Sequence, residues 1–183
     1  VGIFIVTDSP TSISNPSSND KCACPGGRPI KKSRVDFGDV TVAEDINCWD
    51  ISQVTDLAAV FQANMVFNQP LDCWDTSSVT RMKNMFYNAY EFNQPLDTWD
   101  VSKVNTMEGM FELAGFNQPI DSWNIRKVTS FVYTFRAGTA FNQCLASWPD
   151  KAIITYPDYL LKMFEGTACP DTTTTSDPWC QKD

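Results

Sequence analysis

Residues 92–111 read FNQPLDTWDVSKVNTMEGMF, and the same pattern recurs along most of the chain. The Phe-Asn-Gln-Pro motif occurs three times and a variant that ends in cysteine occurs once, in steps of 25, 24 and 25 residues. Such a period indicates a repeat protein, in which each unit buries its apolar face against its neighbours. The four motifs begin at Phe67, Phe92, Phe116 and Phe141, and the repeat tryptophans are Trp49, Trp74, Trp99, Trp123 and Trp148.

The pattern within one unit predicts a short strand followed by a short helix. Residues 96–101 have strand character, with Trp99 facing the core. Residues 104–111 carry apolar side chains at i, i+3, i+6 and i+7, which is one face of a helix, and Ser102 precedes them as an N-cap. About five such units, stacked, predict an α/β repeat solenoid.

Stacking of the units predicts which side chains that are distant in sequence lie close together in space. Equivalent residues lie about 4.8 Å apart along such a stack, so the tryptophans form a core column and the motif asparagines form a ladder. Cys48 and Cys73 each precede a repeat tryptophan, and we therefore predict a disulfide between them. At the C-terminal end, either Cys169–Cys180 or Cys144–Cys169 ties down the last loop.

Composition excludes several classes of function. The 183 residues carry a net charge of −8, which argues against nucleic-acid and anionic-membrane partners. There is no histidine, which removes catalytic triads and histidine-ligated metal sites. Seven cysteines without a CxxC pair indicate an oxidising, extracellular compartment. No apolar run approaches twenty residues, so no membrane insertion is expected.

Aspartates recur on both sides of the repeat tryptophans and allow two interpretations. They form a calcium-binding stripe or a carboxylate pair for glycoside hydrolysis, or they accept hydrogen bonds at turns that are copied with the repeat. The second is favoured, because a catalytic pair is expected to break the repeat. We therefore predict no enzyme activity and no cofactor, with Ca²⁺ as the alternative. The aspartates are Asp72, Asp97 and Asp121 before tryptophan, and Asp50, Asp75 and Asp100 after it.

The chain divides into five segments. Residues 1–6 are an apolar strand, residues 7–20 a linker rich in Ser, Thr and Pro, and residues 21–41 an N-terminal cap; residues 42–168 are the repeats and residues 169–183 a disulfide-tied C-terminal cap. The N-terminal strand either folds back on its own domain or inserts into the next molecule, where it completes an edge. The residues predicted to mediate self-association are Val1, Ile3, Phe4, Ile5 and Val6.

The hydroxyl-rich segments are candidates for O-linked glycans on a secreted chain. The linker and a run of four threonines near the C-terminus have this composition. The candidate residues are Thr11, Ser12, Ser14, Ser17, Ser18, Thr172, Thr173, Thr174 and Thr175.

The quoted string resembles the BspA-like, mycoplasma-lipoprotein-type repeat, a relative of the leucine-rich repeat. The resemblance covers about residues 42–170. It implies a right-handed, leucine-rich-repeat-like solenoid on a cell surface, and it implies no catalytic residues. The fourth unit departs from the pattern, because Cys144 replaces the proline.

These observations predict a non-catalytic structural protein, secreted or on the cell surface. Its copies associate head to tail through the N-terminal strand into a glycan-decorated filament. Its expected partners are therefore other copies of the chain and covalent O-linked glycans. The alternative is a monomeric adhesion or ligand-binding repeat module.

Overall fold

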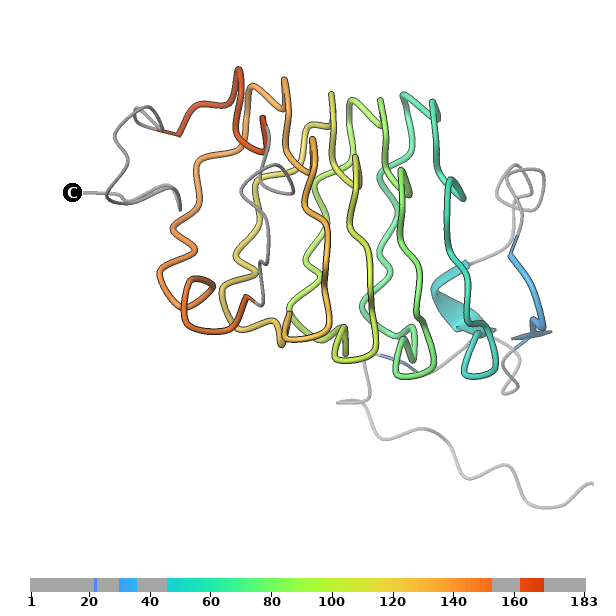
Figure 1. Cartoon of the computed structure of the whole chain (residues 1–183). Coiled ribbons are helices and arrows are strands. Elements are labelled where there is room, and N and C mark those ends of the chain that lie inside the picture. The colour runs from blue at the N-terminus through green and yellow to red at the C-terminus, as the bar shows by residue number, and fades with distance from the viewer. Residues whose placement is uncertain (1–21, 23–29, 36–45, 153–161, 170–183) are drawn as a thin grey trace, which may run out of the picture.

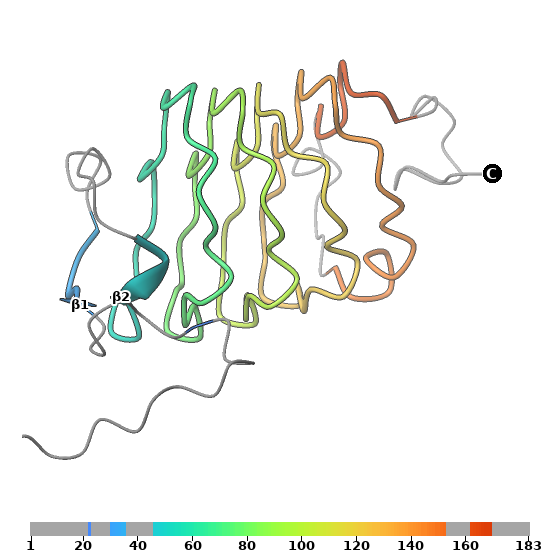
Figure 2. The ribbon, with the colours of Figure 1, turned by 180° about the vertical axis from the view of Figure 1, so that it is seen from behind.

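The computed structural model describes residue 22 and residues 30–35, 46–152 and 162–169. These residues form a stack of chain turns, here called coils, that lie side by side along one axis (Figures 1 and 2). At the N-terminal end, β1 (Ile30–Lys31) pairs in parallel with β2 (Trp49–Asp50), which directly follows the 3-10 helix η2 (Ile46–Cys48). Each coil is named below by its central phenylalanine: Phe61, Phe86, Phe111, Phe135 and Phe164.

The predicted α/β solenoid of leucine-rich-repeat type is wrong. The part of the chain that the structure describes contains no α-helix, and its only strands are β1 and β2, each two residues long. The segment predicted as a strand, residues 96–101, is a turn in which the Trp99 N–H donates to the Leu96 carbonyl at 3.1 Å. The segment predicted as a helix, residues 104–111, is interrupted at Gly109, whose φ is +60°.

Two left-handed residues in every coil prevent helix formation. They lie two positions before and two positions after the central phenylalanine, with φ between 54° and 75°. A non-glycine residue in this region costs about 1–2 kcal/mol, so contacts elsewhere must offset the strain. The residues before the phenylalanine are Ala59, Asn84, Gly109, Tyr133 and Lys162, and those after it are Ala63, Asn88, Leu113, Ala137 and Gly166.

Hydrogen bonds between coils provide that compensation. In the Phe86 coil, the Asn84 N–H donates to the Glu108 carbonyl and the Phe86 N–H to the Met110 carbonyl, both at 2.9 Å. The N–H groups of Met85 and Tyr87, which alternate with these, donate to carbonyls three residues back in the same coil. A helix would use all these N–H groups within one segment, whereas this backbone divides them between turn and neighbour. These bonds give partners to both sets of N–H groups and hold successive coils in register.

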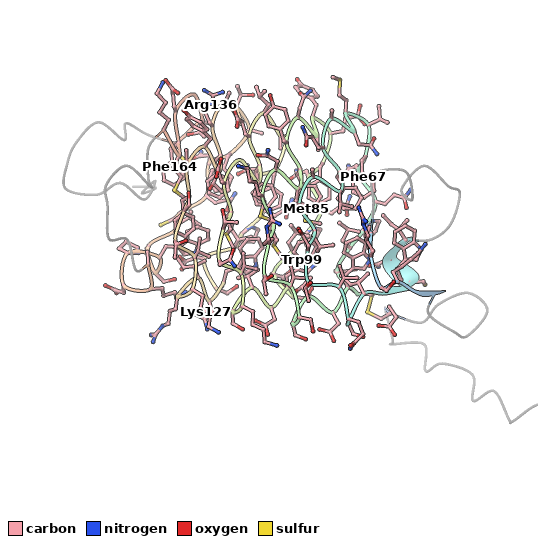
Figure 3. The ribbon with its side chains drawn as sticks, turned by 45° about the vertical axis from the view of Figure 1, so that its right-hand side comes forward. Phe67, Met85, Trp99, Lys127, Arg136 and Phe164 are labelled. Carbon is pink, nitrogen blue, oxygen red and sulfur yellow. A yellow bond between two sulfur atoms is a disulfide. The ribbon has the colours of Figure 1, made fainter. Side chains whose placement is uncertain are left out.

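The predicted column of tryptophans is confirmed. Ring centroids lie 6.3 Å apart for Trp49–Trp74 and for Trp74–Trp99, and 6.5 Å apart for Trp123–Trp148. The central phenylalanines stack in the same way, and the methionines of the repeat are buried with them. Figure 3 shows Met85 and Trp99 inside the stack, whereas Arg136 and Lys127 lie on its two opposite long sides.

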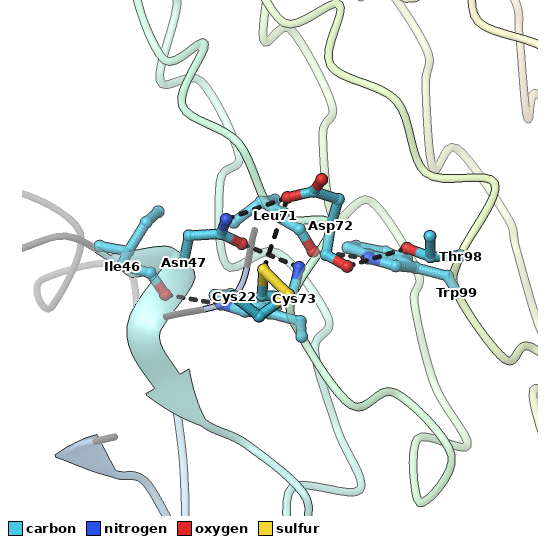
Figure 4. Close-up of a disulfide and its surroundings, with 9 residues drawn as sticks. Cys22, Ile46, Asn47, Leu71, Asp72, Cys73, Thr98 and Trp99 are labelled. Carbon is cyan, nitrogen blue, oxygen red and sulfur yellow. Dashed lines mark hydrogen bonds between the residues drawn. A yellow bond between two sulfur atoms is a disulfide. The ribbon is translucent and has the colours of Figure 1, made fainter. Parts of the chain in front are cut away.

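A disulfide joins the N-terminal cap to the stack, but with a different partner from the one predicted. Cys73 is bonded to Cys22, with Cα atoms 5.5 Å apart, so the Cys48–Cys73 pairing is wrong (Figure 4). The cap, and not the preceding coil, brings a thiol to Cys73. Cys48 and Cys169 are each disulfide-bonded. Cys144 is a free, exposed thiol, so the prediction that it takes part in a disulfide is wrong.

Candidate functional site

Several predicted site residues lie outside the described residues. These are the N-terminal strand, the candidate glycosylation sites and Cys180. The predicted segment boundaries at residues 6, 20 and 41 lie there as well. Predictions about these residues therefore stay predictions.

The aspartates that follow the tryptophans act as turn acceptors. Asp50, Asp75 and Asp100 each accept the N–H of the serine two residues later through Oδ1, at 2.9–3.1 Å. The hydroxyl and N–H of Ser102 hold the pKa of the Asp100 carboxyl below its ordinary value. Ser102, predicted as a helix N-cap, thus belongs to a turn. Within the described ranges, no three Asp, Glu, Cys or His side chains group as a metal site would require.

The aspartates that precede the tryptophans connect neighbouring coils. Asp72 Oδ1 accepts from Asn47 Nδ2 at 2.9 Å, and Asp121 Oδ1 accepts from the Ser147 N–H at 2.9 Å. The Asp72 contact lies beside the Cys22–Cys73 disulfide (Figure 4). Asp97, the third member of the column, is exposed. The arrangement serves capping within the stack and brings no two of these carboxylates onto a common ligand.

The Asn-Gln corners form a ladder with a fixed direction. Asn68 Oδ1 accepts both the Asn93 N–H and Gln94 Nε2 of the next coil, each at 3.0 Å. The same two bonds link each later pair of coils, through Asn93 and Asn117. Every oxygen therefore points toward the C-terminal end of the stack and every donor toward the N-terminal end.

The indole groups form a second directional ladder. Each tryptophan after the first donates its Nε1–H to a carbonyl of the preceding coil, at 2.7–3.3 Å. Trp49, the first of the column, is 2% exposed, and its Nε1 has no hydrogen-bond partner. At the opposite end of the Asn-Gln ladder, the buried Oδ1 of Asn142 also has none. In the described part of the chain, these are the buried side-chain polar atoms without a partner, and each ends a ladder.

The backbone ladder also ends in two unlike edges. In the later coils, four backbone carbonyls accept hydrogen bonds from the coil before them. At the start of the stack, the equivalent carbonyls accept nothing from the described residues; they belong to Asp56, Ala58, Val60 and Gln62. At the end of the stack, the N–H groups of Phe164 and Gly166 are equivalent to groups that donate to the next coil in earlier coils. Among the described residues, these two N–H groups donate to nothing. The backbone at the start of the stack therefore offers acceptors, and the backbone at its end offers donors with the same spacing.

An exposed apolar corner accompanies the acceptor edge. Met65 and Val66, just before the motif of the Phe61 coil, are 54% and 75% exposed. These two residues were not predicted from the sequence, because they do not belong to the repeating positions. The sequence does show that these two positions are not repeated, because Tyr90 and Glu91 occupy the equivalent places in the next coil.

The ladder ends provide a test of the hydrogen-bond assignment. Asn93→Ala leaves the Asn117 N–H without its acceptor and leaves Gln118 Nε2 with the Asn93 backbone carbonyl alone, and we expect it to lower the free energy of unfolding by about 1 kcal/mol. Asn142→Ala removes an oxygen that accepts nothing, so we expect a smaller loss. Urea unfolding of both variants measures the difference. Equal losses would contradict the proposed end of the ladder.

Comparison with known proteins places most of the chain in one family. The family model described as "Mycoplasma protein of unknown function, DUF285" matches residues 33–148. No curated protein and no solved structure matches the chain. In the segments that the structure describes, no helix has the length and apolar character needed to span a bilayer.

Proposed function

Because the chain belongs to the DUF285 family of Mycoplasma proteins of unknown function, we propose a function from its repeat architecture: a non-catalytic structural protein whose copies associate head to tail. We further propose that it is a BspA-like surface protein, secreted or exposed on the cell. The observation that carries the proposal is the pair of unlike edges: carbonyls of the Phe61 coil and N–H groups of the Phe164 coil have no hydrogen-bond partner among the described residues.

Edge polarity favours a heterologous contact over a symmetric one. A two-fold dimer would place carbonyls against carbonyls or N–H groups against N–H groups, neither of which forms hydrogen bonds. Head-to-tail association instead places donors against acceptors, as in the contacts between coils. Such an interface repeats without closing when its rotation does not return to the first copy, and this produces a filament.

The N-terminal apolar strand is the proposed connecting segment. Residues 1–6 read VGIFIV, and a 14-residue linker of extended composition separates them from the cap. An extended strand carries both N–H and C=O groups, so one from a neighbouring copy would accept from the N–H groups of Phe164 and Gly166, which donate to nothing within the described part of the chain. The apolar side chains of the strand would also cover the last core residues at this end of the stack.

An oxidising, extracellular location is part of the proposal. The Cys22–Cys73 disulfide and the bonded state of Cys48 and Cys169 support it, because such bonds persist outside reducing compartments. O-linked glycans on the linker and on residues 172–175 would keep a filament soluble. Intact-mass analysis of native material tests this, and unmodified masses would exclude the glycans.

Self-association is tested by sedimentation and by light scattering after size exclusion. The full chain is expected to form concentration-dependent oligomers, and deletion of residues 1–6 is expected to leave a monomer. Met65→Lys places a charge on the exposed corner of the acceptor edge and should weaken association. A monomeric full chain at every concentration would disprove the proposal.

Tyr90→Lys is the matched control. Tyr90 is 70% exposed and occupies the place in the Phe86 coil that Met65 has in the Phe61 coil. It lies one coil inside the stack, away from the acceptor edge, so the same charge should leave association unchanged. If both variants dissociate the oligomer equally, the contact follows general surface hydrophobicity and not the edge.

A monomeric binding module is the second candidate function. Its support is that outward side chains around each central phenylalanine differ from coil to coil, whereas the inward ones repeat. One position after the phenylalanine, the chain has in turn Gln62, Tyr87, Glu112, Arg136 and Glu165. Saturable binding by a chain that stays monomeric would favour this candidate.

A further inference from the structure

Three cationic side chains lie together at one corner of the stack, here called the basic corner. They belong to Lys103, Arg126 and Lys127, and all three are exposed. In the part of the chain that the structure describes, none of them forms an ion pair or a side-chain hydrogen bond. Cations elsewhere on the stack pair with acids of a neighbouring coil, as Arg81 Nη1 does with Asp56 Oδ2 at 2.9 Å. The basic corner therefore carries local positive charge on a chain whose net charge is −8.

The backbone holds these cations in register along the stack. The Thr129 N–H and hydroxyl both donate to the Asn105 carbonyl, at 2.9 and 3.0 Å, and this fixes one coil over the other. Two positions earlier, Lys103 and Lys127 occupy equivalent places in the two coils, which puts their backbones about 4.8 Å apart. Figure 3 shows Lys127 on the outer surface of one long side. The corner thus presents cations at a distance set by the coil repeat.

A change in the repeat removes the acid that otherwise belongs at this turn. In the three preceding coils, an aspartate accepts the N–H of the residue two positions later. Here Asn124 takes the place of the aspartate, and its Oδ1 accepts the Arg126 N–H at 3.4 Å. The amide keeps the acceptor of the turn but carries no charge. Asp100 and Lys103 share a coil and offset each other in part, whereas the turn that carries Arg126 has no acid.

The surroundings of the basic corner favour one class of polyanion. An acidic peptide in extended form adds to a backbone edge with unpaired N–H and C=O groups, and such edges lie at the two ends of the stack and not at this turn. Single-stranded nucleic acid stacks its bases on exposed aromatic rings, and the aromatic residues of these two turns, Trp99 and Trp123, are buried. An acidic polysaccharide needs neither feature, because it carries its anionic groups on successive sugar rings.

We propose that the basic corner binds an acidic polysaccharide, with the sugar chain running along the stack axis. Lys103 and Lys127 contact carboxylate or sulfate groups on nearby sugar rings, and the planar guanidinium of Arg126 donates two N–H groups to one of them. Release of counterions supplies most of the binding free energy, so the affinity falls steeply with salt concentration. The contact uses exposed side chains on a long side of the stack and is independent of self-association through its ends.

Isothermal titration calorimetry of the full-length chain at several salt concentrations tests the site. The probes are alginate oligosaccharides, which carry carboxylates, and dextran sulfate oligosaccharides, which carry sulfates, with neutral dextran as the uncharged control. At least one of the two polyanions is expected to bind saturably, and the one that binds identifies the anionic group. The double variant Arg126→Gln, Lys127→Gln should weaken binding roughly tenfold and lower the slope of log affinity against log salt by about two.

Two further variants separate this site from general charge effects. The double variant Arg81→Gln, Lys83→Gln removes the same two residue types and the same net charge, but both of these cations are ion-paired. It should change the affinity much less than the corner variant does. Asn124→Asp restores the acid of the other coils and keeps the turn acceptor, so it should weaken binding while the chain stays folded.

The opposite results would overturn the proposal. The site is wrong if neither polyanion binds saturably, if the Arg81, Lys83 variant loses as much affinity as the corner variant, or if Asn124→Asp binds like the unchanged chain. The ligand class is wrong if poly-glutamate of matched charge binds as tightly as the polysaccharides.

Discussion

Trp99→Ala is expected to lower the free energy of unfolding by about 4 kcal/mol, as measured by urea denaturation at neutral pH. Trp99 is 4% exposed and stacks on Trp74 with centroids 6.3 Å apart. Its Nε1–H donates to the Leu71 carbonyl at 2.9 Å (Figure 4). The change therefore removes a large buried ring from the middle of a column and also deletes a bond between coils.

A matched pair of milder substitutions isolates the hydrogen bond. Trp99→Phe and Trp49→Phe remove the same atoms from equivalent places, but only Trp99 Nε1 has an acceptor. Removing an unsatisfied buried donor relieves a cost of about 1–3 kcal/mol, so we expect Trp49→Phe to destabilise less. Lys32 Nζ lies 4.1 Å from the Trp49 ring centroid, and a Lys32→Met background removes this contact from the comparison. An equal or larger loss at Trp49 would contradict the ladder assignment.

Removal of the Cys22–Cys73 disulfide has the second largest expected effect. The bond closes a loop between residues 51 positions apart. Loop-closure entropy for that length predicts a loss of about 4 kcal/mol for the double variant Cys22→Ser, Cys73→Ser. Thermal and urea unfolding under oxidising conditions measure it. Cys144→Ser is the control, because Cys144 is free and exposed, and we expect no measurable change.

The distribution of the disulfide effect tests the position of the cap. If Cys22 holds the cap to the start of the stack, the double variant should lose amide-exchange protection first around Ile46 and Trp74, whose indole donates to the Ile46 carbonyl at 2.7 Å. The Phe111 and Phe135 coils should keep theirs, because contacts in a stack are between nearest neighbours. Uniform loss along the chain would show that the bond acts on the whole stack.

The repeat was predictable from the sequence because it depends on spacing alone. Tryptophans 25 positions apart stack in the structure, and the motif asparagines hydrogen-bond from coil to coil. Burial of Met82 and Met107 followed from the same reasoning. Any in-register stack places these residues over one another, whatever the local backbone conformation.

The helix at residues 104–111 could not be excluded in this way. Its apolar spacing fits one face of a helix, and Gly109 is the only residue in it that favours a left-handed backbone. In the other coils alanine, asparagine, tyrosine or lysine adopts this conformation, against its intrinsic preference. Hydrogen bonds to the next coil stabilise this left-handed conformation, and those bonds cannot be predicted from the local sequence.

The candidate sites show the same division. The Cys48–Cys73 prediction assumed that cysteines in adjacent units pair, whereas Cys73 is bonded to Cys22, 51 positions away in the sequence. The open ends of the ladders lie at the first repeat tryptophan, Trp49, and the last motif asparagine, Asn142, and the repeat pattern alone does not show which polar atom is left without a partner there.

The sequence by itself determined the period, the core columns and the ladder of motif asparagines, because these follow from which side chains recur and where. Only the tertiary structure decided the backbone of each coil, the partner of Cys73 and the polar groups left without partners. Those depend on how each N–H group divides between its own turn and a chain segment about 25 residues away, and that competition is settled only when the coils are in contact.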